Sequence, residues 1–230
     1  MNGLLMTEGP GHEVVAGRLS GRVYSALKTR LVEGDFPAGK RIGIEALRQE
    51  YGVSKQPVME AFRLLASDGI VEIVPQVGCR PMDYSIEEVA DFFRVFAASE
   101  GAVAAAAATR CTPEQIAGLR TALRETADLD QEPDPKIRGR LYRLANRRFH
   151  TRIQEMAASR VIDSVSRRMW DLSDYLVNTF PEGGSFSAHT AERHTDHERI
   201  VQALAHGDAS MARIEMSNHI LHTVRRLGLD

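Results

Sequence analysis

Three histidines that lie far apart in the sequence stand on segments whose apolar spacing predicts helices. His150 follows Asn146 by four residues, so the two side chains share one helical face, and the apolar residues beside His150 indicate that this face points into a core. His197 and His219 lie on two later helical segments. Three imidazoles from three helices can hold one divalent metal, and the core of a helical bundle is where such sites are built.

Other interpretations of these histidines remain open. Each can be an ordinary core or surface residue, and a metal-free polar pocket would use the same side chains. Three histidines with an open coordination position also describe a catalytic zinc site, so a metal-dependent hydrolase is an alternative, with Glu198 and Glu215 as the evident general bases. Three further histidines are expected to be solvated surface residues: His189, His194 and His222.

A second kind of chemistry is indicated between Tyr51 and Gly78. Ser54 is placed to cap a helix, and Pro57 falls in its first turn, where no backbone N–H is lost. Apolar residues then recur at helical spacing and predict one buried face, made of Val58, Ala61, Phe62 and Leu65. After Gly69 the pattern changes to a strand, and Gly78 is expected to supply a positive φ in the following turn.

The polar side of this helix is suited to nucleic acid. A helix N-terminus that carries Lys55 and Gln56 can contact phosphates and base edges in a major groove. Together the turn, helix and hairpin predict a DNA-reading winged helix-turn-helix. The predicted DNA-binding residues lie on the recognition helix and the wing: Ser54, Lys55, Gln56, Met59, Arg63, Gln76, Gly78 and Arg80.

The elements around these two groups predict a mainly α protein in two parts. After a flexible arm at residues 1–17, helices at about Leu19–Glu33 and Ile44–Tyr51 and a small β-hairpin wing would complete a DNA-binding domain at residues 18–82. Residues 83–230 predict an all-α antiparallel bundle. Its six helices are expected at 85–110, from Thr112 to a proline-rich break at 131–135, at 136–156, at 160–180, from a Gly183–Gly184 loop to His206, and at 208–227.

Composition narrows the class of protein. The chain has 230 residues, 43% of them hydrophobic and 26% charged, and no apolar run approaches the roughly 20 residues of a membrane helix. Two cysteines, Cys79 and Cys111, fit a reducing cytoplasm, and we expect neither a secretory signal nor a membrane partner. Residues 18–82 carry ten Lys or Arg against seven Asp or Glu, a mild excess that suits a polyanion.

The same residues resemble the GntR family of bacterial transcription regulators, in its FadR-like subfamily. The loop Glu33–Gly39 (EGDFPAG) and the segment Tyr51–Phe62 (YGVSKQPVMEAF) carry the resemblance, and the C-terminal half is similar to the all-α FCD domain. The family usually has arginine where Lys55 and Met59 stand. The resemblance implies a ligand-responsive homodimer that binds double-stranded DNA, commonly as a repressor, with residues 83–230 binding the effector and forming the dimer.

The resemblance also implies a ligand set in the C-terminal half. Carried over residue by residue, it selects Asn146, His150, His197 and His219 for a divalent metal, with zinc favoured and nickel or manganese as alternatives. Asn146 stands where an aspartate is usual, so an organic-acid effector that coordinates the metal would supply the missing negative charge. Candidate effector-binding residues are Arg94, Phe96, Arg147 and Glu215; Phe96 stands where the family often has an arginine, which predicts a more apolar effector.

The sequence therefore predicts a one-component regulator whose operator affinity changes with a small metabolite. Two protomers would present their recognition helices to a palindromic operator. The alternatives are the metal-dependent hydrolase and a constitutive dimeric DNA-binding protein without an effector.

Overall fold

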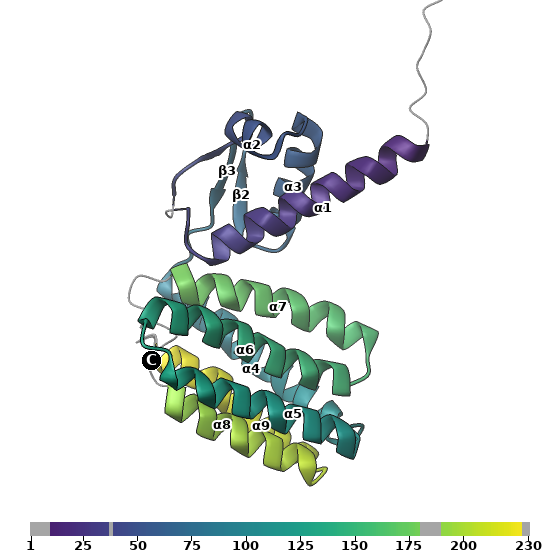
Figure 1. Cartoon of the computed structure of the whole chain (residues 1–230), viewed down its shortest axis with the longest axis vertical. Helices are drawn as coiled ribbons and strands as arrows, with labels where there is room; N and C mark the ends of the chain where they lie inside the picture. Colours follow the sequence, from purple (N-terminus) through teal and green to yellow (C-terminus); the bar gives the residue numbers. More distant parts are fainter. Residues whose placement is uncertain (1–9, 37–38, 180–189, 227–230) are drawn as a thin grey trace, which may run out of the picture. The chain divides into compact units, whose positions relative to one another are not determined.

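The computed structural model describes residues 10–36, 39–179 and 190–226. The chain divides after Asp83 into two compact units, which are described one at a time. Within the described residues, helices predominate and the strands are confined to the first unit (Figure 1). None of the described helices is long and apolar enough to cross a membrane.

The N-terminal unit is a winged helix-turn-helix. Helix α1 (Pro10–Val32) and helix α2 (Ile44–Tyr51) both pack against α3 (Lys55–Ser67). The chain then forms an antiparallel sheet in the order β1-β3-β2, whose strands are β1 (Ile42–Gly43), β2 (Val71–Val74) and β3 (Gly78–Pro81). The predicted hairpin is confirmed, and β1 adds a third strand that the sequence did not suggest.

The predicted core of α3 is confirmed. Val58, Ala61, Phe62 and Leu65 are fully buried, and they meet the inward face of α1, which includes Leu27. Between α2 and α3, Gly52 has a φ of 62° and ends α2 in the left-handed conformation that glycine adopts without a steric penalty. This turn sets the direction of α3 relative to α2.

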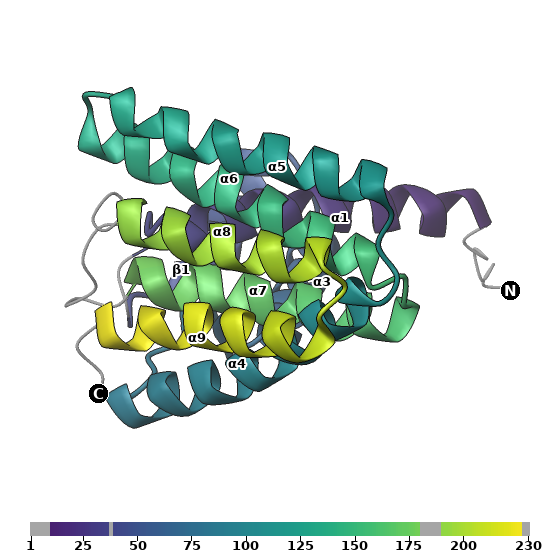
Figure 2. The ribbon, with the colours of Figure 1, turned by 90° about the horizontal axis from the view of Figure 1, so that it is seen from below.

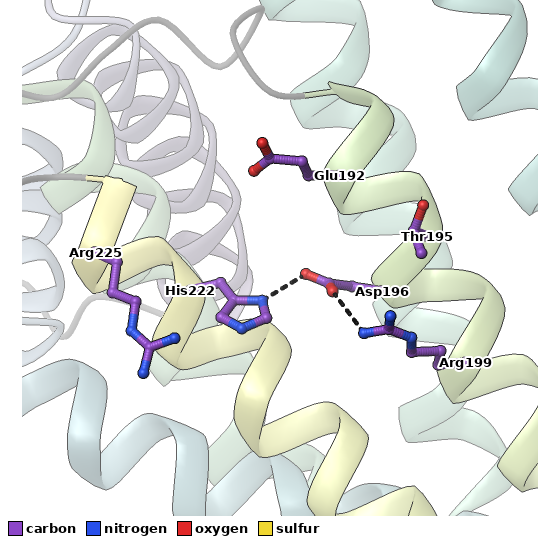
Figure 3. A pocket seen from close by; sticks show the side chains of 6 residues that line it. All are labelled: Glu192, Thr195, Asp196, Arg199, His222 and Arg225. Carbon is purple, nitrogen blue, oxygen red and sulfur yellow. Dashed lines mark hydrogen bonds and ion pairs between the residues drawn. The ribbon is translucent and has the colours of Figure 1, made fainter.

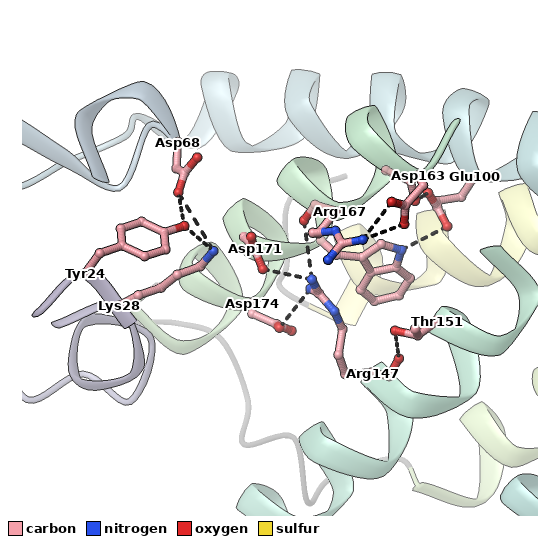
Figure 4. A network of polar contacts seen from close by, with 12 residues as sticks. Tyr24, Lys28, Asp68, Glu100, Arg147, Thr151, Asp163, Arg167, Asp171 and Asp174 are labelled. Carbon is pink, nitrogen blue, oxygen red and sulfur yellow. Dashed lines mark hydrogen bonds and ion pairs between the residues drawn. The ribbon is translucent and has the colours of Figure 1, made fainter. Parts of the chain in front are cut away.

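Polar contacts also fix the end of α3 against α1. The hydroxyl of Tyr24 donates to a carboxylate oxygen of Asp68 at 2.5 Å, and the ammonium of Lys28 lies 3.8 Å from the same oxygen (Figure 4). Asp68 is the residue that follows α3. The side chains of α1 therefore hold the C-terminal end of the helix whose N-terminal end carries the predicted DNA-binding residues.

One expectation about a helix start was wrong, and another was confirmed only in position. Residues 10–17, expected in the flexible arm, belong to α1, because Pro10 is favourable at a first helical position and Gly11 and Gly17 weaken a helix without ending it. Residues 1–9 lie outside the described part of the chain. Ser54 does occupy the N-cap position of α3, but its side chain makes no capping hydrogen bond.

The turn of the wing also differs from the prediction. The N–H of Val77 donates to the carbonyl of Val74, and Gln76, with a φ of 64°, takes the left-handed position after Pro75. Gly78 has the predicted positive φ, 152°, but it is the first residue of β3 and does not lie in the turn. A Cβ there would lie 2.1 Å from the carbonyl oxygen of Ile42, so the close approach of β1 requires glycine.

The C-terminal unit is a helical bundle, as predicted. Its helices are α4 (Ile86–Ala108), α5 (Pro113–Asp128), α6 (Pro135–Met156), α7 (Arg160–Thr179), α8 (Thr190–Ala205) and α9 (Ala209–Arg226), with a short 3-10 helix η1 (Leu129–Gln131) before α6. Ser85 and Thr112 cap the starts of α4 and α5, where each forms a capping box, with Glu88 and Gln115 respectively. The Gly183–Gly184 loop lies outside the described residues.

Helix α4 contacts α6, α7, α8 and α9, most extensively α9, beside which it lies in Figure 2. Its approach to α9 is close because Gly101 faces Ser217, and a Cβ at Gly101 would lie 2.4 Å from the Ser217 hydroxyl oxygen. On the other side, α5 packs against α6 and α8. This arrangement brings the inner faces of α6, α8 and α9 around one point.

Candidate functional site

The three predicted histidines meet in the core of the C-terminal unit. His150 on α6, His197 on α8 and His219 on α9 each present a ring nitrogen within 4.8 Å of the others. The Nε2 atoms of His197 and His219 are 3.2 Å apart. All three side chains are buried, and His150 and His197 have no exposed surface.

Aromatic packing fixes the planes of these rings. Phe149 stacks on His197 with ring centroids 4.3 Å apart, and Trp170 of α7 lies 4.3 Å from the ring of His150. These contacts leave the rings little freedom to turn away from one another. Side-chain packing therefore preorganises the three nitrogens.

Burial also sets the charge of the cluster. Loss of solvent lowers the pKa of His150 and of His197 well below the usual value, and the positive charge of the neighbouring imidazoles acts in the same direction. Both are neutral near pH 7, the form in which imidazole binds a metal.

The hydrogen bonding of His150 tests whether a metal fits. Both of its ring nitrogens are buried without a hydrogen-bond partner, although buried polar atoms are normally paired. A hydrogen bond between His197 and His219 would account for their short distance, but it leaves His150 unexplained. A metal bound by one nitrogen of each ring would give His150 a partner at that nitrogen, so the residues fit such an ion.

Asn146 lies one turn before His150 and is also buried. It lines a small cavity of about 20 Å³ together with His219. We call this the inner cavity; it is lined by Phe93, Asn146, Trp170, Ser173, Asp174, Val177, Arg193, His219, Ile220 and Thr223. A volume of this size holds one ion or water molecule and not an organic acid.

Asp196 is a functional candidate that the sequence analysis missed. Its Oδ2 lies 3.5 Å from Nδ1 of His219 and 2.9 Å from Nδ1 of His222. Burial alone would raise the pKa of Asp196, but the hydrogen bonds and charge of these two histidines outweigh it and hold the pKa below its usual range. A carboxylate behind a ligating histidine fixes its tautomer and orientation.

Asp196 had a signal in the sequence. It lies on the same helical stripe as His197 and Ile200, which continues the apolar face of α8 toward its N-terminus. The expectation that His222 is a solvated residue was wrong, because its side chain is 30% exposed and bonded to Asp196. His194 pairs with Glu198 at 3.5 Å and His189 lies outside the described residues.

A larger space opens on the other side of Asp196. We call it the outer pocket; its volume is about 420 Å³ and it is lined by Glu192, Thr195, Asp196, Arg199, His222 and Arg225 (Figure 3). The lining comes from α8 and α9. Asp196 thus contacts His219 of the cluster and lines this pocket as well.

Arg147 of α6, predicted to bind the effector, forms ion pairs with two aspartates of α7. Its guanidinium lies 2.8 Å from a carboxylate oxygen of Asp171 and 3.3 Å from one of Asp174, and it sits over the ring of Trp170 (Figure 4). Arg147 is absent from the lining of both the inner cavity and the outer pocket. It supports the ring that packs on His150.

Phe96 is fully buried, with its ring centroid 5.0 Å from that of Trp170. The indole N–H of Trp170 donates to Glu100, which also accepts from the Ser166 hydroxyl. Burial raises the pKa of Glu100 against the effect of these hydrogen bonds. Phe96 therefore belongs to the packing behind Trp170, and it does not line the inner cavity.

Two other effector candidates lie away from the histidines. Arg94 is exposed and pairs with Asp91 on the surface of α4 at 2.7 Å. Glu215 lines a separate pocket with Arg199 and His206, and it does not join the histidine cluster found among the described residues. Glu198, the other possible general base, is largely exposed, so neither glutamate is placed for catalysis at the cluster.

The predicted DNA-reading surface of α3 is largely open. Lys55, Gln56 and Arg63 are exposed, Met59 is half-buried, and Ser54 is exposed at the N-cap. Arg63 pairs with Glu60 at 3.2 Å, one turn earlier on the same helix. The first turn of α3 therefore presents cationic and amide groups to solvent.

The wing offers less positive charge than its sequence suggested. Arg80 lies 2.6 Å from a carboxylate oxygen of Glu72 on the paired strand, which offsets its charge. Gln76 is exposed at the turn, whereas Gly78 is buried in β3 and its role is structural.

Comparison with known proteins gives a consistent result. Residues 19–80 match the model described as bacterial regulatory proteins of the gntR family, and residues 91–222 match the FCD domain. The uncharacterized HTH-type transcriptional regulator YdhC of Bacillus subtilis (strain 168) is 24% identical over 89% of this chain and 88% of its own length. The HTH-type transcriptional repressor RspR of Escherichia coli (strain K12) is 31% identical over 45% of this chain and 46% of its own.

The solved structure of E. coli McbR/YncC has the same fold. It superimposes with a TM-score of 0.76 over 91% of this chain and 97% of that chain, at 19% sequence identity.

Metal-free protein should lose stability on acidification below about pH 6.5, where unfolded histidine becomes protonated. His150 and His197 stay neutral in the folded state, so the unfolded state binds more protons as the pH falls. The free energy of unfolding then drops by up to about 1.4 kcal/mol per pH unit for each of them. Urea unfolding followed by Trp170 fluorescence, between about pH 7.5 and about pH 5.5, measures this.

The control is His150→Phe, which removes one of the two histidines and should make the pH dependence shallower. Asp196 does not interfere, because its lowered pKa places its contribution at more acidic pH. A free energy of unfolding that stays level or rises on acidification would contradict the buried neutral state.

Proposed function

The chain belongs to the GntR family of bacterial transcription regulators and carries the FCD effector-binding domain, and on that premise we propose how its own residues bind DNA and sense a ligand. In this proposal a divalent metal binds at the buried histidines, and a small organic acid bound in the C-terminal unit changes the affinity of the protein for operator DNA. The protein acts as a homodimeric repressor on a palindromic operator.

The observation that carries the metal proposal is the convergence of three buried imidazoles, with no hydrogen-bond partner for either nitrogen of His150. Two zinc ligands about 2.0–2.1 Å from the ion in tetrahedral geometry lie roughly 3.3 Å apart. The 3.2 Å between the Nε2 atoms of His197 and His219 is compatible with this spacing. When bound, the ion would supply a positive charge in the core of the C-terminal unit.

Asn146 gives this site its particular chemistry. An amide oxygen binds a metal without neutralising its charge, unlike the carboxylate that is usual at this position of the family. The excess positive charge would favour an anionic ligand in the same unit, which supports an organic acid as the effector. The same excess predicts weaker zinc binding than with aspartate.

The DNA-binding proposal depends on the exposed first turn of α3. Lys55 and Gln56 stand where side chains at a helix N-terminus can enter a major groove, and Arg63 lies two turns further along. Lys55 provides a point charge in place of the forked donors of arginine, and Met59 cannot donate a hydrogen bond. We therefore propose a base preference different from that of relatives with arginine at these two positions.

A repressor function and a two-fold operator are supported by analogy. A relative named as a repressor is 31% identical to this chain over 104 aligned residues. Helix-turn-helix proteins commonly bind DNA as dimers, with one half-site for each protomer. Coupling would follow if the effector stabilises one arrangement of the two recognition helices over another.

Replacing Lys55 should weaken operator binding without affecting the fold. Lys55→Ala and Arg63→Ala are each expected to cost about 1–3 kcal/mol if they contact a base, because both side chains project from the exposed face of α3. Fluorescence anisotropy with operator duplex at several salt concentrations measures this. If the side chain contacts only phosphate, its replacement should instead reduce the slope of log K against log salt concentration by about one.

Arg124→Ala is the matched control, since Arg124 is an exposed arginine on α5 of the other unit. Circular dichroism should show an unchanged fold for all three variants. Full operator affinity in Lys55→Ala would refute the role of that residue.

Zinc should bind to metal-stripped protein at one equivalent and change the fluorescence of Trp170. Trp170 is the single tryptophan of the chain, and its ring lies 4.3 Å from that of His150, so the signal reports on this site directly. His197→Ala should reduce zinc affinity by at least about 100-fold, because only two of the three imidazoles remain.

His206→Ala provides the control for zinc binding, since His206 is exposed at the end of α8 and lies outside the cluster. It should bind zinc like the natural protein. A protein that takes up no zinc at micromolar concentration, or that binds it equally well as His197→Ala, would disprove the site.

A further inference from the structure

The two cavities near the histidine cluster differ greatly in volume. The inner cavity, at about 20 Å³, has room for an ion and not for a metabolite. The outer pocket, at about 420 Å³, falls within the size range of small-molecule sites. A metabolite can therefore enter the outer pocket without any rearrangement of the core.

The lining of the outer pocket indicates what it can recognise. Arg199 of α8 and Arg225 of α9 bring two guanidinium groups to the pocket from different helices, and guanidinium pairs with carboxylate in a bidentate geometry (Figure 3). Glu192 and Thr195 offer acceptors for a hydroxyl group. This combination suits a small hydroxy acid better than an apolar molecule.

We propose that the outer pocket binds a small hydroxycarboxylic acid, and that Asp196 couples this site to the metal-binding histidines. The proposal rests on the effector-binding role proposed above and assigns that role to residues that the sequence analysis did not select. It places the acid beside the metal site, outside the inner cavity.

Asp196 provides the physical connection. One of its oxygens faces Nδ1 of His219 and of His222, and the other lies 4.0 Å from the guanidinium of Arg199. An acid that binds Arg199 competes with Asp196 for that cation. Asp196 is then freer to accept from His219, which strengthens His219 as a metal ligand. The acid and the metal should therefore bind cooperatively.

Malate, a hydroxy dicarboxylate, is the probe. At about 10 mM it should raise the melting temperature of the full-length protein by roughly 2–4 °C, as expected for a ligand present at several times its Kd. Arg199→Gln and Arg225→Gln should abolish the shift, because each removes one guanidinium. Arg94→Gln, which removes an exposed arginine outside the pocket, should keep it.

Coupling is measured by zinc titration followed by Trp170 fluorescence. Malate should increase zinc affinity by about 5-fold or more, and zinc should increase malate affinity by the same factor, since coupling is reciprocal. Asp196→Asn keeps the size of the side chain but loses its charge. At a malate concentration that saturates this variant, the factor by which malate changes zinc affinity should fall to about one.

Several outcomes would overturn the inference. Absence of any malate shift, a shift that survives in both arginine variants, or tighter binding of inorganic phosphate than of malate would remove the assignment of a hydroxy acid to this pocket. Malate binding that leaves zinc affinity unchanged would remove the coupling through Asp196.

The two proposals fail in different ways. If zinc does not bind but the arginine-dependent malate shift is seen, the metal proposal falls and the assignment of the pocket stands. If zinc binds at one equivalent and malate has no effect, the metal proposal stands and the pocket does not bind this class of ligand.

Discussion

A buried imidazole nitrogen needs a partner, because it has lost its hydrogen bonds to water and finds none in an apolar core. The core of the C-terminal unit brings three imidazole rings together, and both ring nitrogens of His150 have no hydrogen-bond partner. The packing of Phe149 and Trp170 limits how far the rings can turn away from one another. Loss of solvent also keeps His150 and His197 neutral. In the proposed function one divalent ion provides the missing partner, and the ion-pair network of Arg147 and the hydrogen bonds of Glu100 hold Trp170 in place.

The two units place their polar side chains differently. In the N-terminal unit, the apolar face of α3 is buried against α1, so its polar side chains are directed to solvent, where DNA can reach them. In the C-terminal unit, polar side chains gather in the core and along α8. Asp196 stands between the core and the surface, since it contacts both a histidine of the cluster and the lining of the outer pocket.

Local patterns in the sequence predicted much of this structure. The period of apolar residues predicted the core of α3, the helices expected from 85 and from Thr112 agree with α4 and α5, and the spacing of Asn146 and His150 placed both on the inner face of α6. Contacts between distant segments were not predictable. Gly78 is needed because β1 approaches it, Arg147 is drawn to α7 by Asp171 and Asp174, and Asp196 meets His222 from another helix. A single sequence records the periodicity of each helix but not which charges meet across a bundle.

The central claim is that the ligand state of the C-terminal unit sets the affinity of the N-terminal unit for DNA. The most direct measurement is the Kd for a duplex taken from beside the gene for this chain, at fixed salt, with metal-stripped protein and with zinc-loaded protein in the presence of a saturating acid. The account predicts Kd values that differ by about 5-fold or more, the usual size of an allosteric coupling. Equal Kd values in the two states would contradict it.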